Sequence, residues 1–215
     1  MLFELRLTVD DRPGSLARLT ALLAELKIDV REIDFLGSVI GQAVDNLLIE
    51  CSQAQLDAVQ AALPGLHGFT LLSARQSTRT PGLMPEFDLL LAVARAPAGT
   101  LDEFTKQAAR VFAADWAMTF AIDSSRARWQ SAQAPEALRV GRFPTRATRV
   151  LPGSSQYSLT PNVLTEMAHT PVGSDHVLLL GRTPGPTFHE LELLRVNRVV
   201  EVAAALLPAR NPARL

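Results

Sequence analysis

The 215-residue sequence predicts an α+β protein of two domains, a ferredoxin-like N-terminal domain and a C-terminal α/β domain. Three observations support this prediction. Strand and helix periodicities follow each other as β-α-β-β-α-β in the first third of the chain, the order of a split β-α-β fold. A polar stretch with two prolines comes next. Beyond it, two helical segments precede strand-like segments, and a long helical segment closes the chain.

The N-terminal domain is expected to span residues 1–76. Its first strand alternates apolar and polar side chains, and a turn leads from it into a helix that Ser15 could cap. Ser52 and Gln55 have the spacing of a capping box, which predicts the start of a second helix. The predicted strands are 3–9, 29–36, 43–51 and 69–74. The helix residues expected to face the sheet are Leu16, Leu19, Leu23, Leu26, Leu56, Val59 and Leu63. The third strand places Asp45 on one face with Leu47, Ile49 and Cys51.

The second half is expected to comprise a linker, a domain and a short tail, at 77–86, 87–208 and 209–215. Helices are predicted near 86–95, from Thr100 onward, at 162–168 and at 189–207. Strands are predicted at 116–123, 127–132 and 177–181, with short strand-like pieces near Val140 and at 149–151. The inward residues predicted for the last helix are Leu191, Leu194, Val199, Val202, Ala203 and Leu206.

Composition excludes several classes of protein. Hydrophobic residues make up 47% and charged residues 20% of the chain, and the formal net charge is -1, so the basic surface of a nucleic-acid binder is not expected. The single cysteine, Cys51, permits no intramolecular disulfide. Neither a signal peptide nor an apolar run of membrane-spanning length is evident. The expectation is a cytoplasmic protein that binds no membrane.

The stretch after the first strand resembles the signature of the ACT domain family. Its residues are Asp11-Arg12-Pro13-Gly14-Ser15-Leu16-Ala17-Arg18-Leu19. The resemblance extends over residues 2–76 and implies a ferredoxin-like fold that binds an amino acid in this loop, at a homodimer interface between edge strands. The ligand-binding residues that it implies are Asp11, Arg12, Pro13, Gly14, Ser15, Leu16 and Asp29.

The chemistry of this loop suits a small ligand. Pro13 fixes its own φ, and Gly14 allows a ligand to approach the backbone closely. The free amides at the start of the helix would attract a carboxylate. Amino-acid-binding members of the family often have Asn where this chain has Asp11 and Asp29, and a carboxylate can accept a hydrogen bond from an ammonium but not hold a second carboxylate. Either the ligand is more cationic, or the site is vestigial and the domain only dimerises.

The second domain resembles a GAF domain in its opening helices and first strand and in its last strand and closing helix. The segments concerned are 92–95, 100–104, 113–116, 177–182 and 188–194. Neither a cyclic-nucleotide signature nor a cysteine that could hold a tetrapyrrole accompanies them. The resemblance implies an antiparallel sheet, and no cofactor is expected.

Catalytic patterns are weak throughout the chain. The four histidines do not have metal-ligand spacing, so no metal site is expected. Ser124, Ser154 and Ser155 lack the Gly-x-Ser-x-Gly elbow. One of them could form a catalytic triad with Asp175 and a histidine, but the sequence does not give the geometry. The leading hypothesis is a ligand-responsive regulatory protein and not an enzyme. The alternatives are an interaction or dimerisation module, with an unknown protein partner, and a hydrolase that uses residues 133–175.

Overall fold

The computed structural model divides the chain into two compact units, Met1–Leu83 and Met84–Leu215. The residues that it describes are 1–39, 41–77, 80–82, 84–96, 100–122, 124, 126–136, 138, 148–150, 166–183 and 185–207. The first unit ends beyond residue 76, and the second begins with a helix at Pro85, inside the predicted linker 77–86. The predicted piece near Val140 and the predicted tail 209–215 lie outside the described residues.

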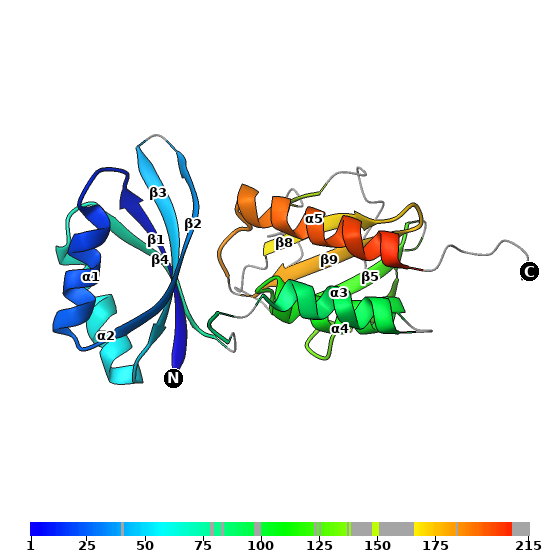
Figure 1. Cartoon of the computed structure of the whole chain (residues 1–215), viewed down its shortest axis with the longest axis horizontal. Helices are drawn as coiled ribbons and strands as arrows, with labels where there is room; N and C mark the ends of the chain where they lie inside the picture. The colour runs from blue at the N-terminus through cyan, green and yellow to red at the C-terminus, as the bar shows by residue number, and fades with distance from the viewer. Residues whose placement is uncertain are drawn as a thin grey trace, which may run out of the picture. The chain divides into compact units, whose positions relative to one another are not determined.

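The N-terminal unit is a four-stranded antiparallel sheet with two helices on one face (Figure 1). Its strands are β1 (Leu2–Asp10), β2 (Asp29–Val39), β3 (Gln42–Glu50) and β4 (Phe69–Gln76). Its helices are α1 (Ser15–Glu25) and α2 (Gln53–Ala62), followed by a 3-10 turn at Leu63–Gly65. The strand order β2-β3-β1-β4 and the element order β-α-β-β-α-β define the ferredoxin-like topology that the sequence predicts.

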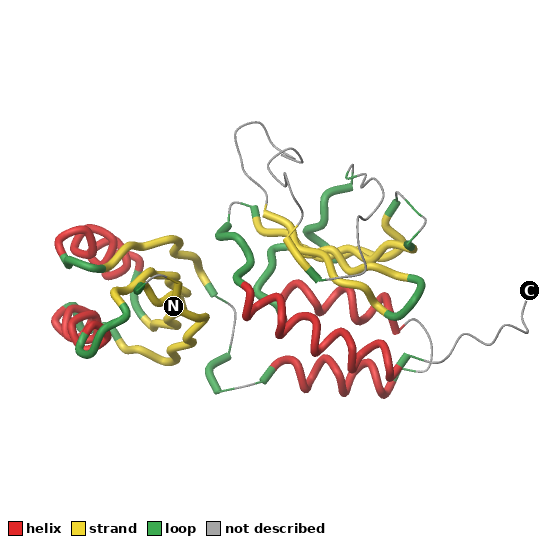
Figure 2. The backbone as a smooth tube through the Cα atoms, turned by 90° about the horizontal axis from the view of Figure 1, so that it is seen from above, coloured by secondary structure: helices red, strands yellow, loops and turns green. Residues whose placement is uncertain are grey.

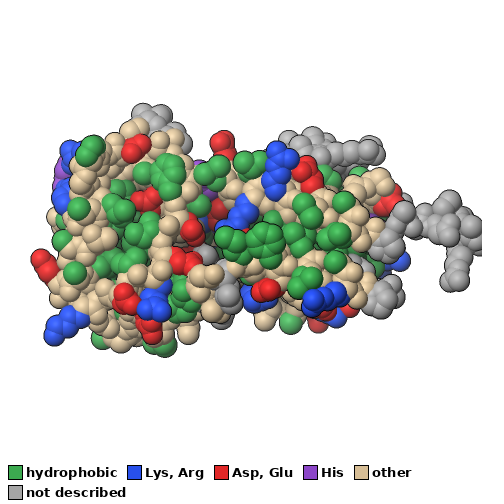
Figure 3. Space-filling view, in the orientation of Figure 1, with side chains coloured by type: hydrophobic (Ala, Val, Ile, Leu, Met, Phe, Trp, Pro, Cys, Tyr) green, Lys and Arg blue, Asp and Glu red, His purple; other side chains and the backbone are tan. Residues whose placement is uncertain are grey.

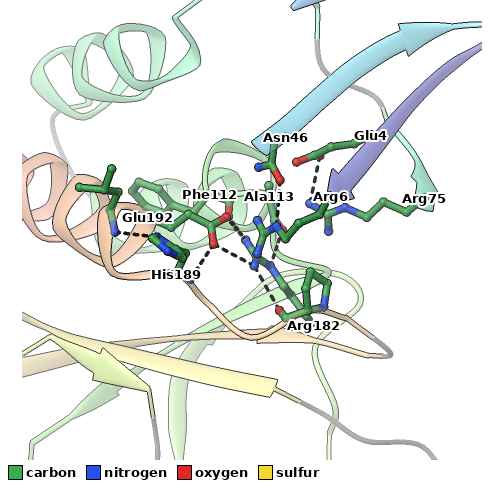
Figure 4. Close-up of polar contacts among 11 residues, drawn as sticks. Glu4, Arg6, Asn46, Arg75, Phe112, Ala113, Arg182, His189 and Glu192 are labelled. Carbon is green, nitrogen blue, oxygen red and sulfur yellow. Dashed lines mark hydrogen bonds and ion pairs between the residues drawn. The ribbon is translucent and has the colours of Figure 1, made fainter. Parts of the chain in front are cut away.

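A single apolar core lies between this sheet and its helices. The buried residues include Phe3, Leu5, Leu7, Val9, Leu19, Leu23, Leu47, Ile49, Leu56, Val59 and Leu63. The predicted capping box is confirmed: Ser52 Oγ accepts from the Gln55 amide at 3.2 Å, and Gln55 Oε1 accepts from the Ser52 amide at 2.9 Å. On the opposite face of the sheet, polar residues pair: Arg6 donates to Asn46 at 2.8 Å, and Arg75 to Glu4 at 3.1 Å (Figure 4).

The start of α1 differs from the prediction. Gly14 is the N-cap, with φ 87°, and Ser15 is the first helical residue instead of the cap. With this start, Ser15, Leu19 and Leu23 form the buried stripe and Leu16 is 40% exposed. The prediction that Leu16 faces the sheet was wrong because the buried stripe is centred near Leu19, between Ser15 and Leu23, and Leu16 lies at the edge of this stripe.

The C-terminal unit has a five-stranded antiparallel sheet with the order β6-β5-β9-β8-β7. The strands are β5 (Trp116–Ala121), β6 (Ala127–Gln130), β7 (Arg149–Val150), β8 (Glu166–Val172) and β9 (His176–Arg182). The helices are α3 (Pro85–Arg95), α4 (Thr100–Val111) and α5 (Glu190–Leu206). All three helices lie on one side of the sheet (Figure 2): α4 and α5 contact the strands, and α3 packs against both of these helices.

Both faces of this sheet are buried. Ala117, Leu178 and Leu180 belong to the core under the helices, and Trp116, Met118 and Leu179 belong to a second apolar cluster. Because alternate residues on β5 and β9 enter different cores, these strands are apolar at nearly every position. This explains the continuous hydrophobic run that predicted the strand at 177–181.

Two predictions for this unit were wrong. Residues 166–168, assigned to a helix at 162–168, begin strand β8, where Ala168 pairs with Leu180; residues 162–165 lie outside the described part. In α5 the buried residues are Val196, Val200 and Ala203. Four of the residues predicted to face inward are exposed, namely Leu191, Leu194, Val202 and Leu206. The helix is apolar on nearly all sides, so its periodicity does not determine which face is buried.

A buried ion pair fixes the start of α5. The Arg182 side chain is 0% exposed and donates to Glu192 at 2.7 Å and to the Ala113 carbonyl at 3.0 Å (Figure 4). Its guanidinium also lies 3.9 Å from the ring centroid of Phe188. Glu192 in turn accepts from the backbone amide of His189 at 2.8 Å, as the N3 member of a capping box. The pair therefore joins the end of β9 to the loop before β5 and to α5.

Candidate functional site

The first turn of α1 presents backbone amides without an internal acceptor. The Ser15 amide donates to the Arg12 carbonyl at 3.2 Å and the Arg18 amide to the Gly14 carbonyl at 3.2 Å. Among the described residues, the amides of Leu16 and Ala17 form no backbone bond of this kind, and no side chain caps the helix. Apart from its neighbours Pro13 and Ser15, no described residue has an atom within 4 Å of the position of a Cβ on Gly14. The positive end of the helix is therefore open to an anionic group.

Two polar side chains beside this turn have atoms without a partner. Ser15 is 3% exposed, and its hydroxyl oxygen is buried with no hydrogen bond. Arg18 lies one turn further along α1; one of its terminal nitrogens donates to the His67 carbonyl at 3.1 Å, and the other is buried with no acceptor. Its guanidinium is held 5.2 Å from the ring centroid of Phe69. A buried donor without an acceptor costs free energy, which a ligand acceptor would recover.

Asp45 adds a carboxylate to the same end of the sheet. Asp45 lies on β3, opposite Leu7 of β1 and opposite Phe35 of β2. Because Leu7 belongs to the core between the sheet and the helices, Asp45 lies on the face that the helices cover. It is 7% exposed, and among the described residues no side chain forms an ion pair with it. Burial, and then the negative charge of Asp11, raise the pKa of the Asp45 carboxyl above its ordinary value of 3.8.

The two halves of this corner have opposite chemistry. The amides of Leu16 and Ala17 favour an anion, and the carboxylates of Asp11 and Asp45 favour a cation. Asp11 belongs to the turn that precedes α1, and its charge raises the pKa of Asp45, so both carboxylates lie toward the end of the sheet from which α1 begins. A small molecule with a carboxylate and an ammonium matches both preferences.

The predicted site residues fall into two groups. Asp11, Arg12, Pro13, Gly14, Ser15 and Leu16 lie together in the turn and first helical residues. Arg12 forms an ion pair with Asp10 at 3.1 Å. Asp29 lies elsewhere: it pairs with Glu50, whereas Asp10 pairs with Gln42 at the other end of the sheet.

Asp29 is also bound to Arg31 at 2.8 Å. Within one chain it is therefore not part of this site.

Sequence reasoning missed Asp45 and Arg18. A signal for Asp45 was present, because a charged residue stood on the inward face beside Leu47 and Ile49, where it needs either a partner or a function. Arg18 gave no such signal: its position on the helix is ordinary, and only the fold brings it over Phe69.

The residues considered for catalysis have structural roles or lie outside the described part. Ser124 accepts from the Arg126 amide at 3.1 Å within a turn, and Asp175 accepts from Ser174 at 2.8 Å. Ser154 and Ser155 are outside the described residues. Over the described ranges, His, Cys, Asp and Glu nowhere gather in a group of three that could hold a metal ion. Among the same ranges, no helix has the length and apolar character needed to cross a membrane.

The sequence matches no protein-family model and no curated protein. Solved structures similar to the chain include a formyltetrahydrofolate deformylase from Burkholderia mallei, with 14% identity, a TM-score of 0.33 and coverage of 96% of this chain and 93% of that one. A protein assigned provisionally as a glycine cleavage system transcriptional repressor has 7% identity, a TM-score of 0.34 and coverage of 95% and 90%. A protein of unknown function from Galdieria sulphuraria has 12% identity, a TM-score of 0.31 and the same coverage. Similarity at these TM-scores supports no functional argument, so the fold class rests on the strand order described above.

Proposed function

We propose that the N-terminal unit is an ACT-like domain that binds an amino acid or a similar small zwitterion, and that the chain is a ligand-responsive regulator and not an enzyme. In this proposal the ligand carboxylate binds the amides of Leu16 and Ala17. The ligand ammonium binds Asp45 and Asp11. The observation on which the proposal depends is the pairing of an uncapped helix N-terminus with a buried carboxylate that lacks a cation.

The two aspartates at the site give the ligand its orientation. Asn residues, common at the equivalent of Asp11 in the family, can donate to a carboxylate, whereas Asp11 only accepts. Asp11 and Asp45 therefore bind the cationic end, and the backbone binds the anionic end. An ammonium between them would neutralise a charge that Asp45 otherwise holds at the cost of desolvation.

The regulatory part of the proposal concerns the C-terminal unit, which we assign as GAF-like. Support comes from the elements on which the resemblance was based: α3 and α4 precede β5, and β9 precedes α5. The proposed homodimer is supported by the edge strand β2, on which Ile33 is 40% and Phe35 58% exposed. A partner that covers Phe35 would also cover its neighbour in the register, Asp45.

Thermal shift and calorimetry of the whole chain with each standard amino acid test this function. A ligand at a hundred times its dissociation constant stabilises the folded state by about 2.7 kcal/mol. Analogues that lack either the amine or the carboxylate should bind at least about tenfold more weakly, because each removes one of the two charge contacts. Asp45→Asn should abolish the shift.

The matched control is Asp57→Asn. Asp57 is an exposed carboxylate on α2 that accepts from Gln53 at 2.8 Å, and its loss should leave binding unchanged. If no amino acid or analogue shifts the melting temperature at millimolar concentration, the sensor function is rejected and dimerisation becomes the better account of this domain.

A further inference from the structure

Large apolar side chains are exposed on the outer surface of the C-terminal helical layer. On α3 they are Met84, Phe87 and Leu91, which are 66%, 67% and 46% exposed. On α5 they are Leu191, Leu194, Val202 and Leu206, between 42% and 50% exposed. Figure 3 shows hydrophobic side chains gathered over this face of the unit. We call these seven residues the α3–α5 surface.

The α3–α5 surface is continuous across the two helices. They pack side by side (Figures 1 and 2), and Arg195 of α5 forms an ion pair with Glu86 of α3. Glu86 directly precedes Phe87, and Arg195 directly follows Leu194. Monomeric proteins seldom expose a contiguous apolar surface of this kind, because water contact with it costs free energy in proportion to its area.

The charges on α5 have a symmetrical arrangement along this surface. Near the middle of the helix lie Arg198 and Glu201, which are 72% and 57% exposed. Leu194 precedes this pair by about one turn, and Val202 lies at its other side. Leu191 and Leu206 lie further out. Read from either end, the exposed face is therefore apolar, then charged, then apolar.

We propose that the α3–α5 surface binds a second copy of this chain about a two-fold axis near Arg198, with the two α5 helices antiparallel. A two-fold interface must be complementary to itself, so each patch has to meet its own copy. In this arrangement Leu194 faces Val202 of the other copy, Leu191 faces Leu206, and the Arg198 and Glu201 side chains lie within reach of each other across the axis. The proposal is independent of any ligand at the N-terminal unit.

A parallel pairing of the same helices is less favourable. It would place Arg198 opposite Arg198 and Glu201 opposite Glu201, and it would align the two helix dipoles. The antiparallel pairing also brings the two Arg198 side chains close together at the axis, but it separates the two Glu201 side chains by six helix positions, roughly 9 Å, and leaves each of them within reach of the other copy's Arg198. It also opposes the two helix dipoles. Charge therefore selects the orientation, and the apolar residues supply most of the binding free energy.

The mass of the full chain in solution, measured by sedimentation and light scattering over a range of concentrations, tests the surface. Leu194→Glu places two carboxylates in the interface and should raise the dissociation constant by at least about thirtyfold, so that the assembly falls to half its mass. The control is Leu72→Glu on β4, because Leu72 is 48% exposed and Leu194 50%. That control should leave the mass unchanged.

Charge reversal and cross-linking test the orientation. Arg198→Glu should weaken the assembly, and adding Glu201→Arg should restore it, because the opposite charges are then exchanged on both copies. Leu191→Cys combined with Leu206→Cys should cross-link two chains under oxidation. Leu191→Cys alone should not, because the two copies of residue 191 would lie fifteen residues apart along the helix pair, roughly 22 Å, far beyond disulfide reach.

The outcomes separate cleanly. A chain that stays monomeric at high concentration, or an assembly whose mass Leu194→Glu does not change, overturns the proposal. Cross-linking by Leu191→Cys alone overturns the antiparallel arrangement. Circular dichroism and a melting curve for Leu194→Glu must match those of the unsubstituted chain, and the Arg198→Glu/Glu201→Arg rescue provides a second readout that misfolding would not produce.

Discussion

Glu192 in the C-terminal unit and Asp45 in the N-terminal unit are both carboxylates largely removed from water, but their surroundings differ. Glu192 has a bidentate partner in Arg182 and accepts from the His189 amide. For Asp45, the charged group that acts on its carboxyl within the described part of the chain is another carboxylate, Asp11. A buried carboxylate with its hydrogen bonds satisfied holds structure together, whereas one without a cation destabilises the free protein. This difference is why we place binding at Asp45 and not at the Arg182 cluster.

The largest effect should follow from breaking the satisfied pair. Arg182→Met leaves Glu192 buried without its cation and removes the donors to the Ala113 and Pro186 carbonyls. We expect a loss of about 3–5 kcal/mol of unfolding free energy, measured by chemical denaturation. The control, Lys106→Met, breaks an ion pair of 2.6 Å with Asp102 that is 53% and 40% exposed, and should cost far less, because water screens an exposed pair. Equal losses of unfolding free energy in the two variants would show that the buried ion pair stabilises the fold no more than the exposed one.

A smaller effect is expected at the backbone of the site. Gly14→Ala retains the left-handed φ of 87° only with strain, although nothing obstructs the added methyl group. We expect a loss of about 1–2 kcal/mol. Gly65→Ala is the control, since its Cβ position is also open and its φ is not in the left-handed region. If Gly14→Ala is as stable as the control, the turn can relax and its geometry does not depend on glycine.

The unsatisfied carboxylate should show the opposite sign. Asp45→Asn removes a charge that burial disfavours, so the ligand-free protein should melt a few degrees higher at neutral pH while losing the binding proposed above. One substitution would then raise the stability of the free protein and abolish ligand binding. A lower melting temperature would indicate that the Asp45 carboxylate already has a stabilising role in the free protein.

The pH dependence of this gain should be distinctive. Because the folded-state pKa of Asp45 is raised, the folded protein binds more protons than the unfolded chain between pH 3.8 and the raised value. The stability contributed by protonated Asp45 is therefore lost as the pH rises through this window. The difference in unfolding free energy between Asp45→Asn and the unsubstituted chain should grow with pH across it and then level off. A difference that does not change with pH would mean that Asp45 has an ordinary pKa.

Local patterns predicted most of the fold and the turn that forms one side of the site, but not Asp45. Alternation in β1 and the Ser52–Gln55 capping box were sufficient for the N-terminal topology, since each depends only on neighbours in the sequence. The phase of α5 failed because Leu191 and Val196 are equally apolar, and only contact with the sheet distinguishes them. The role of Asp45 could be suspected from its inward position, but the absence of a cation near it is a property of the folded chain.

The helix that receives the linker, α3, has an unusual attachment. It packs mainly against α4 and α5, and its buried residues include Leu89 and Val93. In chain order α3 is the first element of the second unit, so a displacement of the preceding segment would reach this helix before any strand of the unit. Because α3 is not part of the sheet, a movement of this helix would require Leu89 and Val93 to repack but would break no hydrogen bond between strands.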